Sequence, residues 1–141
     1  MDDKYYMGLA LNEARKAYAL DEVPIGCVIV KEGKVIARSY NQKSLKNIAT
    51  YHAEVLAINK ACCKLGTWYL DDCTLYTTVE PCMMCCGAIQ QARLSRVVYG
   101  TKNEAFGYLS KVNSGKIDVV GGMLEEECSM LLTNFFKNKR N

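Results

Sequence analysis

The order in which helical and strand-like patterns alternate along the 141 residues is the strongest constraint on the fold. Apolar residues at helical spacing predict helices over residues 3–20, 52–65, 82–93 and 124–139. Runs of β-branched and alternating residues predict strands over residues 23–31, 35–40, 74–79, 96–100 and 117–120. This order is typical of an α/β domain in which one sheet of mixed direction carries helices on both faces.

Local signals set several of these boundaries. Glu32-Gly33-Lys34 is a turn signal, so the first two strands are expected to form a hairpin. Gly66 is placed to end the second helix, and Pro81 is expected at the N1 position of the third, where its missing N–H costs nothing. Residues 41–50 are polar and are expected to form an irregular loop. The strand–helix–strand steps from Thr74 onward should be parallel and right-handed.

The composition is that of a folded globular protein, with 50% hydrophobic residues and a net charge of +3. Its length is that of one domain spanning residues 1–141, since a single hydrophobic core is sustained at this size. The longest apolar stretches, such as residues 23–30, are far shorter than the roughly 20 residues that span a bilayer, so no membrane association is expected. The N-terminus lacks a basic and an apolar signal region, which leads us to expect a cytoplasmic protein.

The sequence contains eight cysteines but only one histidine. In a reducing cytoplasm these cysteines are not expected to form disulfides, which leaves metal binding, catalysis or packing. Cys86 adjoins a candidate ligand but is expected to face away from it. The cysteines interpreted as small buried hydrophobes are Cys27, Cys62, Cys63, Cys73 and Cys128.

The two remaining cysteines belong to Pro81-Cys82-Met83-Met84-Cys85, and Cys82 follows His52 by 30 residues. Cys82 and Cys85 are spaced i, i+3 at the start of a helix, so their sulfurs share one face and the helix dipole favours thiolates there. His52 likewise begins its helix. Together they offer three ligands for zinc and leave a fourth tetrahedral position open for water, as in catalytic zinc sites.

Glu54 follows His52 by two residues and is expected to move protons rather than to bind the metal. Zinc lowers the pKa of a coordinated water toward ~7, so a neighbouring carboxylate can accept its proton. A Cys-x-x-Cys pair can also be a redox dithiol or two buried small residues. The redox alternative leaves His52 and Glu54 without a role, which favours the zinc interpretation.

The two motifs resemble those of the cytidine/deoxycytidylate deaminase superfamily, His-x-Glu followed by Pro-Cys-x-x-Cys. Within the superfamily the chain resembles the bacterial tRNA adenosine deaminases, which convert the wobble adenosine of an anticodon to inosine. The C-terminal helix ending in Phe-Phe and basic residues narrows the resemblance to this branch. The matching segments are residues 22–26, 41, 52–55, 74–85, 87–89, 96–100, 122–128, 131–132 and 135–137.

The resemblance implies a three-layer α-β-α cytidine-deaminase-like fold with a mixed five-stranded sheet, and one zinc ion per subunit of a homodimer. It implies that a water activated by zinc attacks C6 of adenine, while Glu54 carries protons to ring N1 and to the departing ammonia. The substrate would be an anticodon stem–loop of tRNA whose adenosine is flipped into the pocket. The residues implied to contact or enclose the base are Asn41, Pro24, Ile25 and Ala53.

Two segments depart from the family pattern. The first is Ile48-Ala49-Thr50-Tyr51, where bacterial members usually have Asp-Pro-Thr-Ala, and here a change at the pocket mouth is expected. The second is residues 103–110, where a change in substrate specificity is expected. At the C-terminus, Phe136, Lys137 and Arg140 are candidate RNA contacts. Complementing the helix dipole is an equally good interpretation of the basic residues, and one of Phe135 and Phe136 is expected in the core.

Two other functions remain open. One is deamination of a free base or nucleoside (guanine, cytosine or adenosine) with the same residues. The other is a zinc-stabilised RNA-binding module without catalysis.

Overall fold

The computed structural model describes residues 2–104, 107 and 116–139. Local signals begin and end several elements: the Asp2 side chain accepts the Tyr5 N–H at 2.9 Å to cap the first helix, and Gly66, with φ of 69°, ends the third. The elements are α1 (Asp3–Ala19), β1 (Gly26–Lys31), β2 (Lys34–Tyr40), α2 (Lys43–Lys46), α3 (Ala53–Leu65), β3 (Cys73–Val79), α4 (Met83–Gln91), β4 (Arg96–Thr101), β5 (Asp118–Val120) and α6 (Glu125–Lys139).

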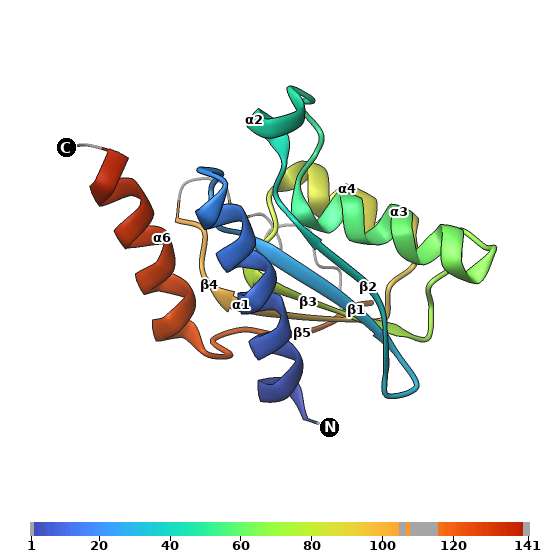
Figure 1. Ribbon diagram of the computed structural model, residues 1–141. Coiled ribbons are helices and arrows are strands. Elements are labelled where there is room, and N and C mark those ends of the chain that lie inside the picture. Colours follow the sequence, from blue (N-terminus) through green and yellow to red (C-terminus); the bar gives the residue numbers. More distant parts are fainter. Residues whose placement is uncertain (1, 105–106, 108–115, 140–141) are drawn as a thin grey trace.

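The strands form one five-stranded sheet in the order β2-β1-β3-β4-β5 (Figure 1). β1 pairs antiparallel with both β2 and β3, whereas β4 pairs parallel with β3 and with β5. The predicted hairpin, the parallel step after β3 and the mixed direction of the sheet are therefore confirmed.

Helices cover both faces of this sheet (Figure 1). Adjacent residues of β3 show the division, because successive side chains of a strand point to opposite faces. Leu75 lies in the core formed with α3 and α4, and Tyr76 lies in the core formed with α1 and α6. The structure thus has the predicted three-layer α-β-α architecture.

The segment over residues 41–50 is not wholly irregular, since it contains the one-turn helix α2. The buried carboxylate of Glu22 accepts the backbone N–H groups of Ser44, at 3.2 Å, and of Leu45. These bonds satisfy donors that a helix start leaves without partners. The expectation of a plain loop was wrong because this cap comes from a residue far from α2 in the chain.

The start of α4 also differs from the prediction. Cys82 is the N-cap and the helix begins at Met83, so Pro81 precedes the cap instead of occupying N1. The Cys82 backbone is extended, with φ of −75° and ψ of 177°, and forms an antiparallel bridge with Gly107. Strand-like pairing therefore continues past Pro81 and delays the helix.

The cysteines are free thiols. Cys27, Cys73 and Cys128 are buried as predicted and Cys62 is half-buried, but Cys63 lies exposed on α3. The expectation of burial was wrong for Cys63 because its side of the helix faces solvent. Cys86 is buried, and its thiol donates to the Pro81 carbonyl at 3.6 Å.

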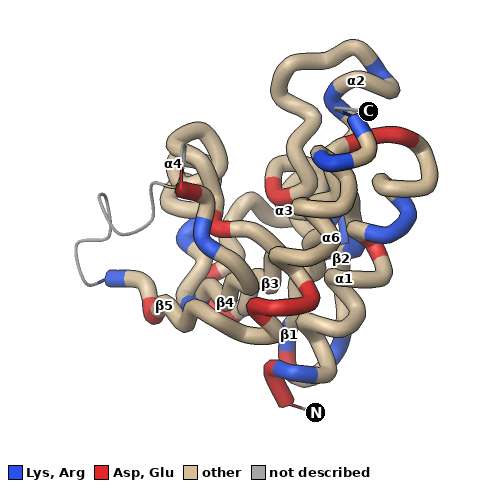
Figure 2. The backbone as a smooth tube through the Cα atoms, turned by 90° about the vertical axis from the view of Figure 1, so that its left-hand side faces the viewer, with Lys and Arg blue, Asp and Glu red and all other residues tan. Residues whose placement is uncertain are grey.

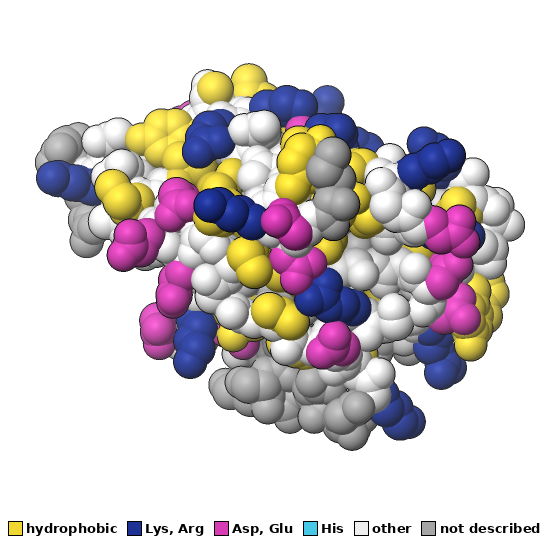
Figure 3. All heavy atoms as spheres, turned by 90° about the horizontal axis from the view of Figure 1, so that it is seen from below, with side chains coloured by type: hydrophobic (Ala, Val, Ile, Leu, Met, Phe, Trp, Pro, Cys, Tyr) yellow, Lys and Arg dark blue, Asp and Glu magenta, His cyan; other side chains and the backbone are white. Residues whose placement is uncertain are grey.

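Charged residues of both signs are interspersed over the molecule. Basic and acidic stretches alternate along the backbone in Figure 2, and the face shown in Figure 3 carries basic, acidic and apolar side chains side by side. Within the described ranges, no helix combines the length and the apolar character needed to cross a bilayer.

Candidate active site

The only histidine and the Cys-x-x-Cys pair come together in space. His52 is the N-cap of α3 and Cys82 is the N-cap of α4, with Cys85 in the first turn of α4. The His52 Nδ1 atom lies 3.6 Å from the Cys82 Sγ atom and 3.5 Å from the Cys85 Sγ atom. All three ligand atoms lie within 4.8 Å of one another, so they can bind a single metal ion.

The electrostatics of this group favour a thiolate. A hydrogen bond from Cys85, and a second one from His52, lower the pKa of the Cys82 thiol to about 3. The pKa of Cys85 is raised by its hydrogen bond to Cys82 and by burial, and that of His52 is raised by its hydrogen bond to Cys82. Thiolate and imidazole donors suit Zn²⁺, and three protein ligands leave one tetrahedral position open.

Glu54 lies in the first turn of α3, buried beside the three candidate ligands. Burial raises the pKa of its carboxyl to about 7, since desolvation disfavours the charged form. The neighbouring His52 and Cys85 act in the opposite direction and lower this pKa. A carboxyl group with a pKa near neutrality can both accept and return a proton at physiological pH.

Of the three candidate ligands, His52 lines a cavity of about 700 Å³ at the carboxyl ends of β3 and β4. In α/β sheets this edge is where ligands usually bind. One wall comes from the chain before β1 and after β2, a second from the end of β4, and a third from α6. The lining residues are Val23, Ile25, Asn41, Lys43, His52, Ala53, Val79, Thr101, Lys102, Asn103, Glu104, Ser129, Leu132, Thr133 and Phe136.

Asn41 is fixed between two segments of the first wall. Its Nδ2 donates to the Val23 carbonyl at 3.2 Å, and its Oδ1 accepts the Lys43 N–H at 3.2 Å. The amide is therefore held in one orientation. Each of its two atoms retains capacity for one further hydrogen bond to a ligand.

The structure places the other residues singled out from the sequence as follows. Ile25, Ala53 and Phe136 line the cavity with Asn41 and His52, whereas Pro24 is buried behind the lining. Lys137 is exposed outside the cavity, and Arg140 lies outside the described residues.

Two segments were noted above as departing from the family pattern. Most of the second, residues 103–110, also lies outside the described residues. Tyr51 is half-buried and is not part of the lining. Its carbonyl accepts the Gln42 N–H at 3.0 Å, which joins the two ends of the segment around α2.

Sequence reasoning missed several lining residues. Ser129, Leu132 and Thr133 are three of them, and with Phe136, which the sequence had already singled out, they are spaced i, i+3, i+4 and i+7 and form one face of α6. That spacing was available in the sequence as a signal. Lys43, Thr101 and Lys102 had no such signal, because only the tertiary fold brings their segments to the ligand group.

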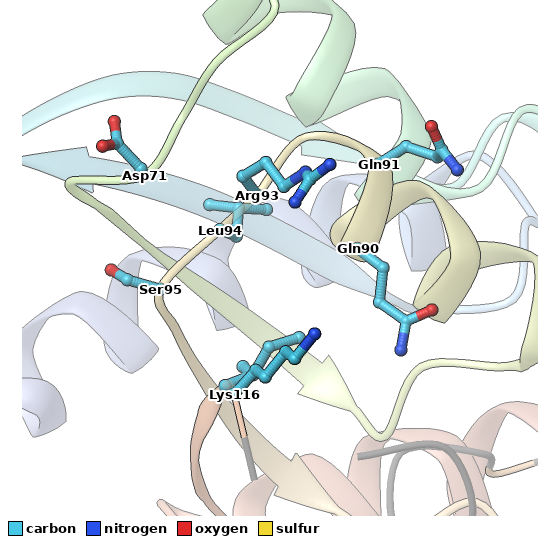
Figure 4. Close-up of a pocket in the computed structure, with 8 residues that line it drawn as sticks. Asp71, Gln90, Gln91, Arg93, Leu94, Ser95 and Lys116 are labelled. Atoms are coloured by element: carbon cyan, nitrogen blue, oxygen red, sulfur yellow. The ribbon is translucent and has the colours of Figure 1, made fainter. Parts of the chain in front are cut away.

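A second cavity, of about 430 Å³, lies at the opposite edge of the sheet, where β3, β4 and β5 begin (Figure 4). Gln90, Arg93 and Lys116 are among its lining residues, and it contains none of the three metal-ligand candidates. The chemistry assembled at the first cavity is absent from this one.

Comparisons with known proteins agree with this geometry. The family model of MafB19-like deaminases matches residues 1–140. The tRNA-specific adenosine deaminase of Bacillus subtilis is 42% identical over 98% of this chain and 91% of its own length. A solved structure from a study of A-to-I editing by tRNA:A34 deaminases at the wobble position of transfer RNA has 41% identity and a TM-score of 0.86, covering 91% of this chain and 99% of that one.

A guanine deaminase from Bacillus subtilis is also similar, with 40% identity and a TM-score of 0.71 over 76% of this chain and 72% of its own. Sequence, fold and the His52–Cys82–Cys85 group with buried Glu54 thus lead to one conclusion. The chain belongs to the MafB19-like deaminase family, and within the deaminases to the family of the bacterial tRNA-specific adenosine deaminases.

Proposed function

We propose that the protein is a zinc-dependent hydrolase that converts adenosine to inosine at the wobble position of a tRNA anticodon. The observation that carries the proposal is the placement of buried Glu54 beside the His52–Cys82–Cys85 group, of which His52 lines a cavity large enough for a base. The Bacillus subtilis relative and the solved structure of the tRNA:A34 deaminase supply the substrate class.

The residues divide the chemistry between them. His52, Cys82 and Cys85 would hold Zn²⁺, which supplies a water-derived nucleophile at neutral pH when bound. Glu54 accepts the proton of the attacking water and delivers it to N1 of adenine. It then transfers the second proton to the C6 amino group, which leaves as ammonia while the C6 carbonyl of inosine forms. Asn41, held by Val23 and Lys43, hydrogen-bonds the base edge.

An RNA substrate fits the cavity better than a free base does. Lys43 and Lys102 line it from separate walls, and cations at such positions match the phosphates that flank a flipped nucleotide. The tRNA:A34 deaminase structure also combines 41% identity with a match over 91% of this chain and 99% of that one. Guanine deamination is the second candidate function, and the 40% identity to the guanine deaminase supports it.

The proposal includes the assembly and setting expected of such an enzyme. The chain acts as one domain over residues 1–141, in a cytoplasmic homodimer with one zinc per subunit. Phe136 lines the cavity and Lys137 follows it on α6, so both belong to the proposed RNA surface, together with Arg140.

The test is an assay of the zinc-loaded protein on an anticodon stem–loop with adenosine at the wobble position, with guanine and free nucleosides assayed in parallel. We expect inosine to form in the stem–loop. Glu54→Gln should lower kcat by about 10²- to 10⁴-fold with zinc still bound, because it removes only the proton carrier. The control is a stem–loop with guanosine at the same position, which should not react.

Three outcomes contradict the proposal. Turnover of only the small molecules would exclude the tRNA assignment, and undiminished activity of Glu54→Gln would exclude the role of Glu54. Less than one zinc per two purified chains would contradict the metal assignment.

A further inference from the structure

Glu80 is a buried carboxylate for which the deaminase chemistry gives no role. It lies between β3 and Pro81, two residues before the ligand Cys82, and is 7% exposed. None of the ion pairs formed by the described residues includes it. Burying a carboxylate costs free energy of folding unless its oxygens accept hydrogen bonds, so the groups that contact Glu80 indicate what its side chain does.

The partners of Glu80 belong to the wall at the end of β4. Its Oε1 accepts the backbone N–H of Asn103 at 3.3 Å. Its carboxyl group also packs directly on Gly107, where a methyl group added to the Cα would lie 2.6 Å from the Glu80 Cδ atom and clash with Oε1. The Gly107 N–H donates in turn to the Asn103 carbonyl at 2.9 Å. The carboxylate therefore occupies the space between these two points of the chain.

This wall lines the same cavity as the candidate ligand His52. Thr101, Lys102, Asn103 and Glu104, which we call the 101–104 wall, all line the cavity with His52 and Ala53. The main chain of Glu80 anchors the start of the same wall, since its N–H donates to the Thr101 carbonyl at 2.8 Å. The main chain of Glu80 thus holds Thr101, and its side chain holds Asn103.

We propose that Glu80 is a positioning residue: its carboxylate fixes the 101–104 wall and thereby determines how tightly the flipped nucleotide is bound. The inference rests on the proposed function for the identity of that nucleotide. It assigns Glu80 no proton transfer and no contact with the metal.

The side chain can be changed while the connection to the metal ligands remains. The Glu80–Thr101 bond and the Cys82–Gly107 bridge are made by backbone atoms, so substitution of the Glu80 side chain removes neither donor nor acceptor. Glu80→Ala removes the acceptor for Asn103, whereas Glu80→Gln retains an oxygen at that position. The matched control is Glu13→Ala, because Glu13 is a buried carboxylate on α1 that pairs with Lys16 and does not line the cavity.

The experiment measures KM and kcat on the wobble-adenosine stem–loop, zinc content, and amide hydrogen exchange at Asn103. For Glu80→Ala we expect about a tenfold rise in KM, a change in kcat below about twofold, full zinc content and faster exchange at Asn103. Glu80→Gln should restore KM to within about threefold of wild type and slow the exchange again. Glu13→Ala should change neither KM nor exchange at Asn103.

Loss of zinc or a fall in kcat at unchanged KM in Glu80→Ala would overturn the proposal, because both indicate an effect through Cys82. A Glu80→Gln variant as impaired as Glu80→Ala would overturn it as well. If the wild type leaves the stem–loop unchanged, the proposed function fails, and unaltered exchange at Asn103 in Glu80→Ala then separately refutes the role of Glu80.

Discussion

Gly26 begins β1 directly beneath α1, at a position where no other residue fits. A methyl group on its Cα would overlap the Ala10 carbonyl and the Ala14 amide, and would lie 2.9 Å from the Glu13 Cβ atom. Two of these neighbours are backbone atoms of a helix and cannot turn aside. The Gly26 N–H also donates to the Thr78 hydroxyl at 3.1 Å, so the strand is held close to the helix from both sides.

We therefore expect Gly26→Ala to lower the free energy of unfolding by about 3 kcal/mol, the upper end of the overpacking range. The matched control is Gly8→Ala on α1, where a methyl group meets no atom within 4 Å. This control should raise the free energy of unfolding by roughly 0.5–1 kcal/mol, because alanine costs less conformational entropy in a helix. Urea unfolding of both variants measures the difference, and equal stabilities would contradict the close-contact argument.

Two adjacent phenylalanines on α6 have different surroundings. Phe135 is buried and packs edge-on against Tyr18 at a centroid distance of 5.7 Å, whereas Phe136 is exposed and lines the cavity. The expectation that one of the two belongs to the core is confirmed. The sequence could not decide which, because neighbouring residues on a helix differ only in direction, and the position of α6 on the sheet sets that direction.

At the scale of elements, one charged cluster joins the start of α1 to three strands. The Asp3 carboxylate accepts bonds from Arg96 Nη1 at 2.8 Å, Arg96 Nη2 at 2.7 Å and the Tyr76 hydroxyl at 2.7 Å. Arg96 also donates from Nε to Asp118 at 3.1 Å. The cluster thus connects α1, β3, β4 and β5, and the bonds from Arg96 hold the pKa of Asp3 below its usual value.

This cluster should make stability pH-dependent. Because the pKa of Asp3 is lower in the folded than in the unfolded protein, its stabilisation is complete above the unfolded value of about 3.9 and is lost as the pH falls through the folded value. At pH 7, Asp3→Asn should lower the free energy of unfolding by roughly 1–2 kcal/mol. Denaturant unfolding from pH 7 to pH 2 should show this deficit shrink below about pH 4, and a constant deficit would refute the linkage.

At the scale of the whole molecule, α3 and α4 present their N-terminal ends to each other on one face of the sheet. The three candidate ligand atoms belong to two segments of the chain, since His52 precedes Cys82 by 30 residues and Cys85 by 33, so an ion bound there ties together parts of the molecule that unfolding separates. Metal binding and folding are then thermodynamically linked.

Removal of zinc with a chelator should therefore lower the Tm, and adding zinc back should restore it. An ion at 100 times its Kd stabilises the folded state by about 2.7 kcal/mol, which corresponds to a Tm shift on the order of 5–10 °C at this chain length. Cys85→Ser should remove most of this zinc-dependent shift, while Cys63→Ser, at an exposed cysteine outside the ligand group, should retain it. Equal shifts in both variants would exclude the proposed ligand set.

The features that the sequence determined are those that rest on local patterns. Periodicity and turn residues were sufficient for the α/β order and the hairpin, because helices and strands repeat over a few residues. The Cys82–Cys85 spacing and the single histidine likewise identified a candidate ligand group, since each motif is local and the chemistry of zinc admits few alternatives.

Tertiary structure alone decided what surrounds that group. Glu22 caps α2 from outside its own segment, pairing of Cys82 with Gly107 moves the start of α4 past Pro81, and Glu80 reaches Asn103 at the end of another strand. Each of these contacts joins residues more than twenty positions apart, and no short-range pattern encodes such a contact. Local sequence motifs thus supply the residue types for the chemistry of this protein, while the shape of its pocket depends on long-range contacts that only the packed fold establishes.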